Sequence, residues 1–135
     1  MFIALDLKGK TVQIITFLGI LEAKLNVSPA LIVVPNSTIT NWVREFERWA
    51  PRLRVVPFHG EQKSREIVKK YELFHKFPGA GTTGAKYHVL VTTYETVTGQ
   101  KDFIPVFKKT PRWEVLIVDE GQRCKFTGAL RQRGN

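Results

Sequence analysis

The chain has 135 residues, of which 43% are hydrophobic, so it is long enough for one globular domain with a buried core. Its formal net charge of +9 favours a polyanionic partner such as nucleic acid, although a basic surplus can also serve solubility alone. No run of about eighteen apolar residues and no signal-peptide pattern occurs, so we expect an intracellular protein without a membrane partner. The single Cys124 leaves no internal disulfide, and the three histidines lack the spacing of a zinc site.

Short apolar segments alternate along the chain with amphipathic ones. A brief strand is predicted at residues 2–5 and a helix at 11–25. Further strands are predicted at 30–34, 55–58, 88–92 and 115–118, with helices at 37–49 and 64–75. This alternation predicts an α/β fold with a parallel sheet, right-handed crossovers, helices on both faces and ligands beyond the carboxyl ends of the strands.

Each predicted helix has an apolar stripe that we expect to face the sheet. The spacing of these residues is helical, which is far more often a sign of core packing than of a binding surface. The stripes consist of Ile14, Ile15, Leu18, Leu21 and Leu25 in the first helix, Trp42, Phe46 and Trp49 in the second, and Ile67, Val68, Tyr71 and Phe74 in the third.

Two short segments carry the candidate chemistry. Residues 9–11, Gly-Lys-Thr, open the first helix and offer backbone N–H groups, an ammonium and a hydroxyl to phosphate and Mg²⁺. The strand at 115–118 ends in Asp119 and Glu120, which brings two carboxylates to its carboxyl tip. Each segment alone is a weak signal, because Gly-Lys-Thr recurs by chance and such a carboxylate often caps a helix. Their order favours an NTP-driven protein.

A second glycine-rich stretch, residues 79–86, imitates a phosphate-binding loop. Its lysine does not follow a glycine directly, and a strand follows it instead of a helix. We therefore interpret residues 76–86 as a surface loop.

The middle of the chain carries a more specific pattern. Residues 31–51 read LIVVPNSTITNWVREFERWAP, and His59-Gly60, VLVTTYE at 89–95 and WEVLIVDEGQRCK at 113–125 follow in order. These blocks resemble those of Swi/Snf-like chromatin-remodelling ATPases, a branch of superfamily two helicases, over about residues 9–125. The Asp-Glu-Gly-Gln box resembles that of fungal chromodomain (CHD, Mi-type) members. The Asn-Trp-x-x-Glu-Phe-x-x-Trp pattern resembles remodellers rather than RNA helicases.

The resemblance implies a RecA-like (P-loop NTPase) lobe and carries roles onto matching residues. Lys8, Gly9, Lys10 and Thr11 would contact the phosphates of ATP, with Lys10 neutralising the β and γ phosphates and Thr11 ligating Mg²⁺. Asp119 would hold the same metal ion.

Two residues beyond the strand at 115–118 match family positions that take part in ATP hydrolysis. The resemblance implies that Glu120 orients or deprotonates the attacking water, and that Gln122 couples the nucleotide to neighbouring motifs. For Gln122, plain solvation beyond a strand is an equally weighted alternative.

The resemblance also implies DNA contacts at residues 35–38 and 92–95, which follow strands. Ser37, Thr38 and Thr93 are the candidates, because small hydroxyls and backbone N–H groups at helix starts suit phosphate. Helix capping is the alternative role, and the two roles can coexist.

Four arginines lie close together in the sequence at positions 44, 48, 52 and 54. They could meet phosphate, but exposed arginines opposite an apolar helix face usually form only a solvated surface. We give phosphate contact the smaller weight.

The chain departs from the family pattern at both ends. The family loop reads Ala-Asp-Glu-Met-Gly-Leu-Gly-Lys-Thr, whereas Leu7, or Lys8 if one residue is deleted, replaces the inner glycine here. A side chain at that position should weaken nucleotide binding. Residues 1–8 diverge from the family pattern, and residues 126–135 match nothing expected of the family. The adenine-contacting motif, the third motif and the second lobe with its arginine finger have no counterpart.

We therefore expect residues 1–135 to be a truncated first ATPase lobe with a sheet lacking at least one strand. The family function is ATP-driven translocation on nucleosomal DNA, which implies ATP, Mg²⁺, DNA or the nucleosome, and a nuclear location. Gly9 and Asp119 should lie at the carboxyl ends of adjacent strands. The alternative is a noncatalytic DNA-binding or interaction fragment with a degenerate nucleotide site.

Overall fold

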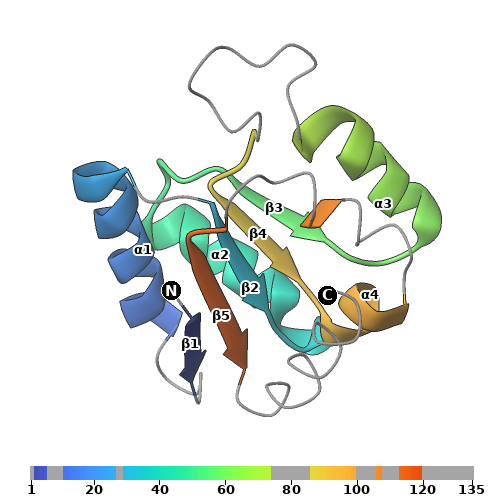
Figure 1. Ribbon diagram of the computed structural model, residues 1–135, viewed down its shortest axis with the longest axis horizontal. Helices are drawn as coiled ribbons and strands as arrows, with labels where there is room; N and C mark the ends of the chain where they lie inside the picture. The colour runs from blue at the N-terminus through green and yellow to red at the C-terminus, as the bar shows by residue number, and fades with distance from the viewer. Residues whose placement is uncertain are drawn as a thin grey trace.

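The fold is a parallel sheet covered by helices on both faces (Figure 1). The computed structural model describes residues 2–5, 11–26, 29–73, 86–99, 106–107 and 113–119. Five parallel strands in the order β1-β5-β2-β4-β3 make the sheet: β1 (Phe2–Leu5), β2 (Ala30–Val33), β3 (Val55–Phe58), β4 (Val89–Thr92) and β5 (Val115–Asp119). The predicted α/β class is confirmed, including the brief first strand.

Among the described residues, four α-helices of six residues or more lie between these strands. They are α1 (Thr11–Leu25), α2 (Ile39–Trp49), α3 (Gln62–Val68) and α4 (Tyr94–Gly99). A 3-10 turn, η1 (Asn36–Thr38), precedes α2, and α3 continues into a π-helical segment, η2 (Lys69–Leu73). The chain moves across the sheet in one direction through α1 and α2 and returns through α3 and α4. Right-handed crossovers therefore place the two pairs on opposite faces.

The core consists of one apolar cluster on each face of the sheet. The face under α1 and α2 holds side chains from those helices, such as Ile15 and Phe46, against alternate strand residues such as Ile32. The other face packs Leu73 from η2 and Val97 from α4 against the remaining strand residues. The central strands are buried on both faces, as their unbroken apolar sequences indicate.

Several residues expected in the apolar stripes are exposed. Trp49 and Leu25 each lie at the last residue of a helix and are 47% and 66% exposed. Ile67 and Tyr71 are also exposed, and Arg65 is the buried residue of α3. The prediction of an inward apolar face is therefore wrong for these four residues, whereas Ile14, Ile15, Leu18, Trp42 and Phe46 are buried as expected.

No helix in the described ranges is long and apolar enough to cross a membrane.

Candidate functional site

The two strands that precede the predicted phosphate and metal segments are neighbours in the sheet. β1 pairs with β5 in parallel, and Leu5 lies opposite Asp119 at the carboxyl ends of both strands. β1 ends at Leu5 and α1 begins at Thr11, so a strand precedes a helix at the spacing that a phosphate-binding segment requires. The expected adjacency of the two strands is confirmed, while Gly9 itself lies outside the described residues.

The start of α1 fits an anion. The helix has 15 residues, and its first turn, which carries the positive end of the helix dipole, contains no acidic side chain. Thr11 brings a hydroxyl to this end, and the neighbouring β5 ends in the carboxylate residue Asp119. Hydroxyl and carboxylate oxygens are the donors that Mg²⁺ prefers, so this donor set fits a magnesium ion next to phosphate.

The other members of the predicted nucleotide site stay predictions. Lys8, Gly9, Lys10, Glu120 and Gln122 lie outside the described residues. For Asp119 the structure gives the place of the backbone at the end of β5.

The end of β2 carries two of the predicted DNA contacts. Here η1 precedes α2, and Ser37 is exposed within this turn. Thr38 is the N-cap residue of α2 but makes no side-chain capping hydrogen bond; its hydroxyl donates to the Pro35 carbonyl at 2.9 Å instead. The expected capping role at this helix start is therefore absent at Thr38.

Thr93, the third predicted contact, follows the neighbouring strand β4 and is buried. The Thr96 backbone N–H donates to its hydroxyl at 3.1 Å, and the hydroxyls of Thr93 and Thr96 are 2.9 Å apart. This is the N-cap geometry, so the alternative capping role is filled by Thr93.

Side-chain bonds join the carboxyl ends of β2, β3 and β4. Buried Thr92 donates its hydroxyl to the Phe58 carbonyl at 2.7 Å, and His59 Nδ1 lies 3.2 Å from Asn36 Oδ1. Partial burial lowers the pKa of His59, because desolvation disfavours the charged ring.

A second side-chain hydrogen bond holds the turn after β3. Gly60 has a φ of +90°, and its carbonyl accepts a hydrogen bond from the buried guanidinium of Arg65 in α3. Residues Asn36, Thr92 and Arg65 were not singled out from the sequence. Of these three, only Thr92 could have been identified from the sequence, because it is a polar residue at the end of an apolar strand.

Three of the four arginines lie away from this edge, whereas Arg44 lines a hollow with His59 near it. Arg52 and Arg54 precede β3 and so lie toward the amino ends of the strands, and Arg48 is near the end of α2. Arg52 pairs with Glu22 of α1 at 3.0 Å, and Arg48 stacks 5.1 Å from the Trp49 ring centre. For these three arginines the geometry agrees with the smaller weight given to phosphate contact.

The sequence matches a known protein family over most of its length. The SNF2-related domain matches residues 8–133. The chain belongs to this family. Similar proteins include Protein CHROMATIN REMODELING 4 of Arabidopsis thaliana, 44% identical over 122 residues, and Chromatin remodeling factor mit1 of Schizosaccharomyces pombe, 40% identical over 118 residues. Each alignment covers 87% of this chain, which spans 5% and 8% of the length of these relatives.

A solved structure of the family shows the same fold. The SWI2/SNF2 ATPase core of Sulfolobus solfataricus, in complex with dsDNA, superposes with a TM-score of 0.66 at 22% sequence identity. The superposition covers 98% of this chain and 25% of the archaeal chain. The expected resemblance to remodelling ATPases and to their RecA-like core is thereby confirmed.

Proposed function

We propose that this chain forms the ATP-binding part of an ATP-dependent chromatin remodeller, working in the nucleus on the DNA of nucleosomes. One observation carries the proposal: β1, which α1 follows in the sequence, pairs with β5 so that Leu5 lies opposite Asp119, in a chain of the SNF2-related family. The names of its relatives as chromatin-remodelling factors support the choice of substrate.

In this proposal the α1 end of the site holds the phosphates of ATP. Backbone N–H groups of Lys8 and Gly9 contact phosphate oxygens, and the ammonium of Lys10 neutralises the β and γ phosphates. The Thr11 hydroxyl and the Asp119 carboxylate hold Mg²⁺, which when bound neutralises charge that develops during phosphoryl transfer. A side chain in place of the inner loop glycine weakens this grip, so the affinity should be low.

Glu120 and Gln122 act next to the metal ligands. Glu120, directly after Asp119, orients or deprotonates the attacking water. Gln122 links this motif to the neighbouring ones, which is a positioning role.

For DNA we propose contacts at the ends of β2 and β4. Ser37 has an exposed hydroxyl, and both it and Thr38 lie in or beside the turn that starts α2. Thr93 keeps its hydroxyl inside the protein, so it would meet phosphate through its backbone alone.

A noncatalytic DNA-binding fragment is the second candidate. The substituted loop glycine and the net charge of +9 favour it, because charge attracts DNA whether or not ATP binds. Affinity for ATP·Mg²⁺ separates the two functions.

The first experiment measures that affinity with a fluorescent ATP analogue and Mg²⁺. We expect weak saturable binding that falls by about tenfold to a hundredfold in Lys10→Ala, because a hydrogen bond to a charged group is lost. Lys24→Ala is the matched control, since it removes the same charge at the far end of α1. Equal affinity in Lys10→Ala and the native chain would reject the proposed nucleotide site.

The second experiment measures ATP hydrolysis by the 135-residue polypeptide with and without DNA. We expect no DNA-stimulated turnover, because no arginine finger is matched in this polypeptide and such a residue contributes about 10³ to 10⁵ in rate. Glu120→Gln controls for contaminating ATPases. Stimulated turnover that disappears in Glu120→Gln would show that the polypeptide is a complete enzyme by itself.

A further inference from the structure

The hollow that Arg44 and His59 line lies between α2 and the end of β3. One side consists of α2 residues that share a helix face through their spacing, and Pro57 and His59 form the other side. The residues on the α2 side are Thr40, Val43, Arg44 and Glu47. The volume of the hollow is about 280 Å³, which leaves room for a phosphate group together with water.

This hollow adjoins the segment that carries two of the proposed DNA contacts. Its α2 lining starts at Ile39, directly after Thr38. On the other side, His59 Nδ1 lies 3.2 Å from Asn36 Oδ1, which joins that side to the same turn. A DNA strand that reaches the exposed Ser37 hydroxyl is therefore brought close to the hollow.

Arg44 is the arginine of the hollow, and it is available for a ligand. The residue is exposed, and its guanidinium forms no ion pair or hydrogen bond with another described residue. Side chains of an α-helix lean toward the helix start, so that of Arg44 leans toward the turn that holds Ser37.

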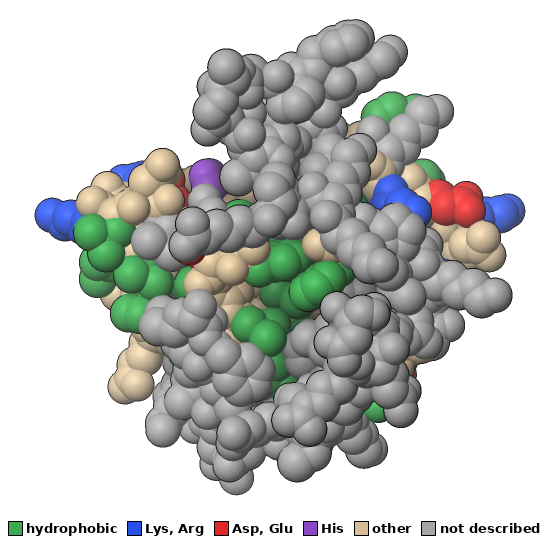
Figure 2. Space-filling view, in the orientation of Figure 1, with side chains coloured by type: hydrophobic (Ala, Val, Ile, Leu, Met, Phe, Trp, Pro, Cys, Tyr) green, Lys and Arg blue, Asp and Glu red, His purple; other side chains and the backbone are tan. Residues whose placement is uncertain are grey.

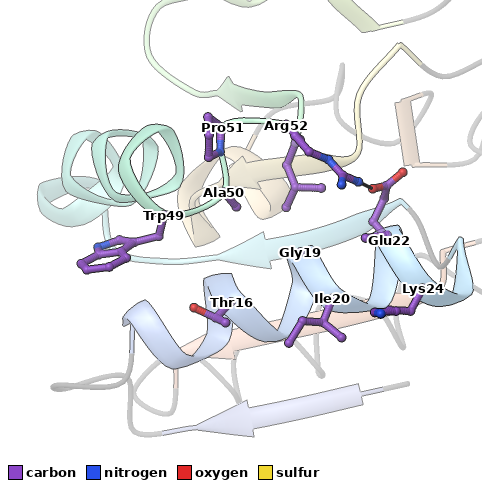
Figure 3. Close-up of a pocket in the computed structure, with 11 residues that line it drawn as sticks. Thr16, Gly19, Ile20, Glu22, Lys24, Trp49, Ala50, Pro51 and Arg52 are labelled. Carbon is purple, nitrogen blue, oxygen red and sulfur yellow. Dashed lines mark hydrogen bonds and ion pairs between the residues drawn. The ribbon is translucent and has the colours of Figure 1, made fainter.

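Other cationic side chains are engaged or distant. Arg52 pairs with Glu22 at 3.0 Å, as Figure 3 shows, and the Arg48 guanidinium lies 5.1 Å from the Trp49 ring centre. Figure 2 shows the side of the molecule opposite to α2, where the Lys and Arg side chains of the described residues stand apart, over α1 and over α3. Arg44 is therefore the arginine of the cluster that is best placed to extend the DNA contacts at Ser37.

Glu47 is the carboxylate residue of the lining, and it lies at the far end of the hollow. It comes three residues after Arg44 along α2 and also lines a second hollow with Pro51 and Leu53, toward the amino edge of the sheet. An anion that enters beside Ser37 therefore meets the guanidinium before it meets the carboxylate.

We propose that this hollow holds a backbone phosphate of the DNA strand that also contacts Ser37, with the Arg44 guanidinium donating to the phosphate oxygens. The inference rests on the proposed DNA-binding function and adds a residue to it. The planar guanidinium presents several donors that match the oxygens of a phosphate group. Such a contact adds affinity without sequence preference.

The test is fluorescence anisotropy of a labelled duplex with the 135-residue polypeptide between about 50 and 200 mM salt. Arg44→Gln should weaken binding by about fivefold to tenfold and lower the slope of log affinity against log salt by about 0.9. Arg54→Gln is the matched control, because it removes the same charge at the amino end of β3. This control should change affinity by less than about twofold and keep the native slope. Arg44→Lys keeps the charge and should keep the slope.

Circular dichroism verifies that each variant keeps its helices. Equal weakening in Arg44→Gln and Arg54→Gln would overturn the proposal, because it would reduce the effect to net charge. Unchanged DNA affinity in Arg44→Gln would overturn this site alone. If that variant instead lost binding of a phosphoserine peptide, the hollow would belong to a phosphorylated protein. A native polypeptide without salt-dependent DNA binding would overturn the proposed DNA function together with this site.

Discussion

His59 connects two turns at the carboxyl edge of the sheet. Its Nδ1 lies 3.2 Å from Asn36 Oδ1, so the turn after β3 contacts the turn that starts α2. Burial lowers the pKa of His59 from its usual 6.5, which means that the folded protein keeps the ring neutral at a pH where the unfolded chain protonates it.

This shift predicts a pH dependence of stability. A lowered folded-state pKa contributes stability above the unfolded pKa of 6.5 and loses it as the pH falls through the folded value. Urea unfolding should therefore show a smaller free energy of unfolding at about pH 5.5 than at about pH 7.5. In His59→Gln, which keeps a hydrogen-bonding side chain without titration, this difference should shrink. An unchanged difference would place the pH dependence in other groups.

The residues of the candidate site were only partly predictable. The positions of Thr11 at the start of α1 and of Asp119 at the carboxyl end of β5 agree with the prediction, because both elements have a clear apolar pattern. The pairing of His59 with Asn36 depends on how two turns approach each other after the sheet has formed. No short sequence pattern indicates that these two turns come into contact.

At the scale of elements, two glycines have opposite roles. Gly19 lies inside α1, and a Cβ placed there would be 3.6 Å from Ala50 Cβ, an ordinary contact. Gly60 has a φ of +90°, where L side chains are strained although nothing lies within 4 Å.

Alanine at these two positions should therefore shift stability in opposite directions. Gly19→Ala should raise the free energy of unfolding by about 0.5 to 1 kcal/mol through helix propensity and a stiffer unfolded chain. Gly60→Ala should lower it by about 1 to 2 kcal/mol through backbone strain. Chemical denaturation of both variants checks the pair, and a loss of stability in Gly19→Ala would mean that α1 and Ala50 are packed more tightly than the 3.6 Å contact implies.

The elements themselves were largely predictable. All five strands were found, and α1 has its predicted bounds, because buried strands and long periodic helices carry strong local signals. The predicted buried face was wrong in two places of the third helical segment. Ile67 lies two residues after the buried Arg65 and therefore on the opposite side of α3. From Lys69 the chain has π geometry, which changes the spacing of the stripe, so Tyr71 faces solvent while Leu73 is buried.

For Trp49 the reason is its place at the end of α2. Ala50 and Leu53, just beyond the helix, belong to the core cluster, and the indole is drawn toward Glu45 instead. Periodicity alone does not indicate where a helix passes the edge of its sheet.

On the scale of the whole molecule, the proposed DNA contacts predict a particular salt dependence. Contacts to phosphate release counterions, so affinity for duplex DNA should be weak and fall steeply between about 50 and 200 mM salt. Two duplexes of unrelated sequence should bind within about twofold of each other, because phosphates carry no sequence information. Fluorescence anisotropy with both duplexes checks this, and an affinity independent of salt would argue against phosphate contacts.

The strand order also governs how the chain can reach its folded state. β5 follows β2, β3 and β4 in the sequence, yet it lies between β1 and β2, and Phe2 pairs with Leu116. β2, β3 and β4 can therefore pair with one another before residues 115–119 have been synthesised, whereas β1 has to wait for β5, its neighbour in the sheet. Such distant pairing closes a long loop, so the docking of β1 against β5 should be a slow step of folding.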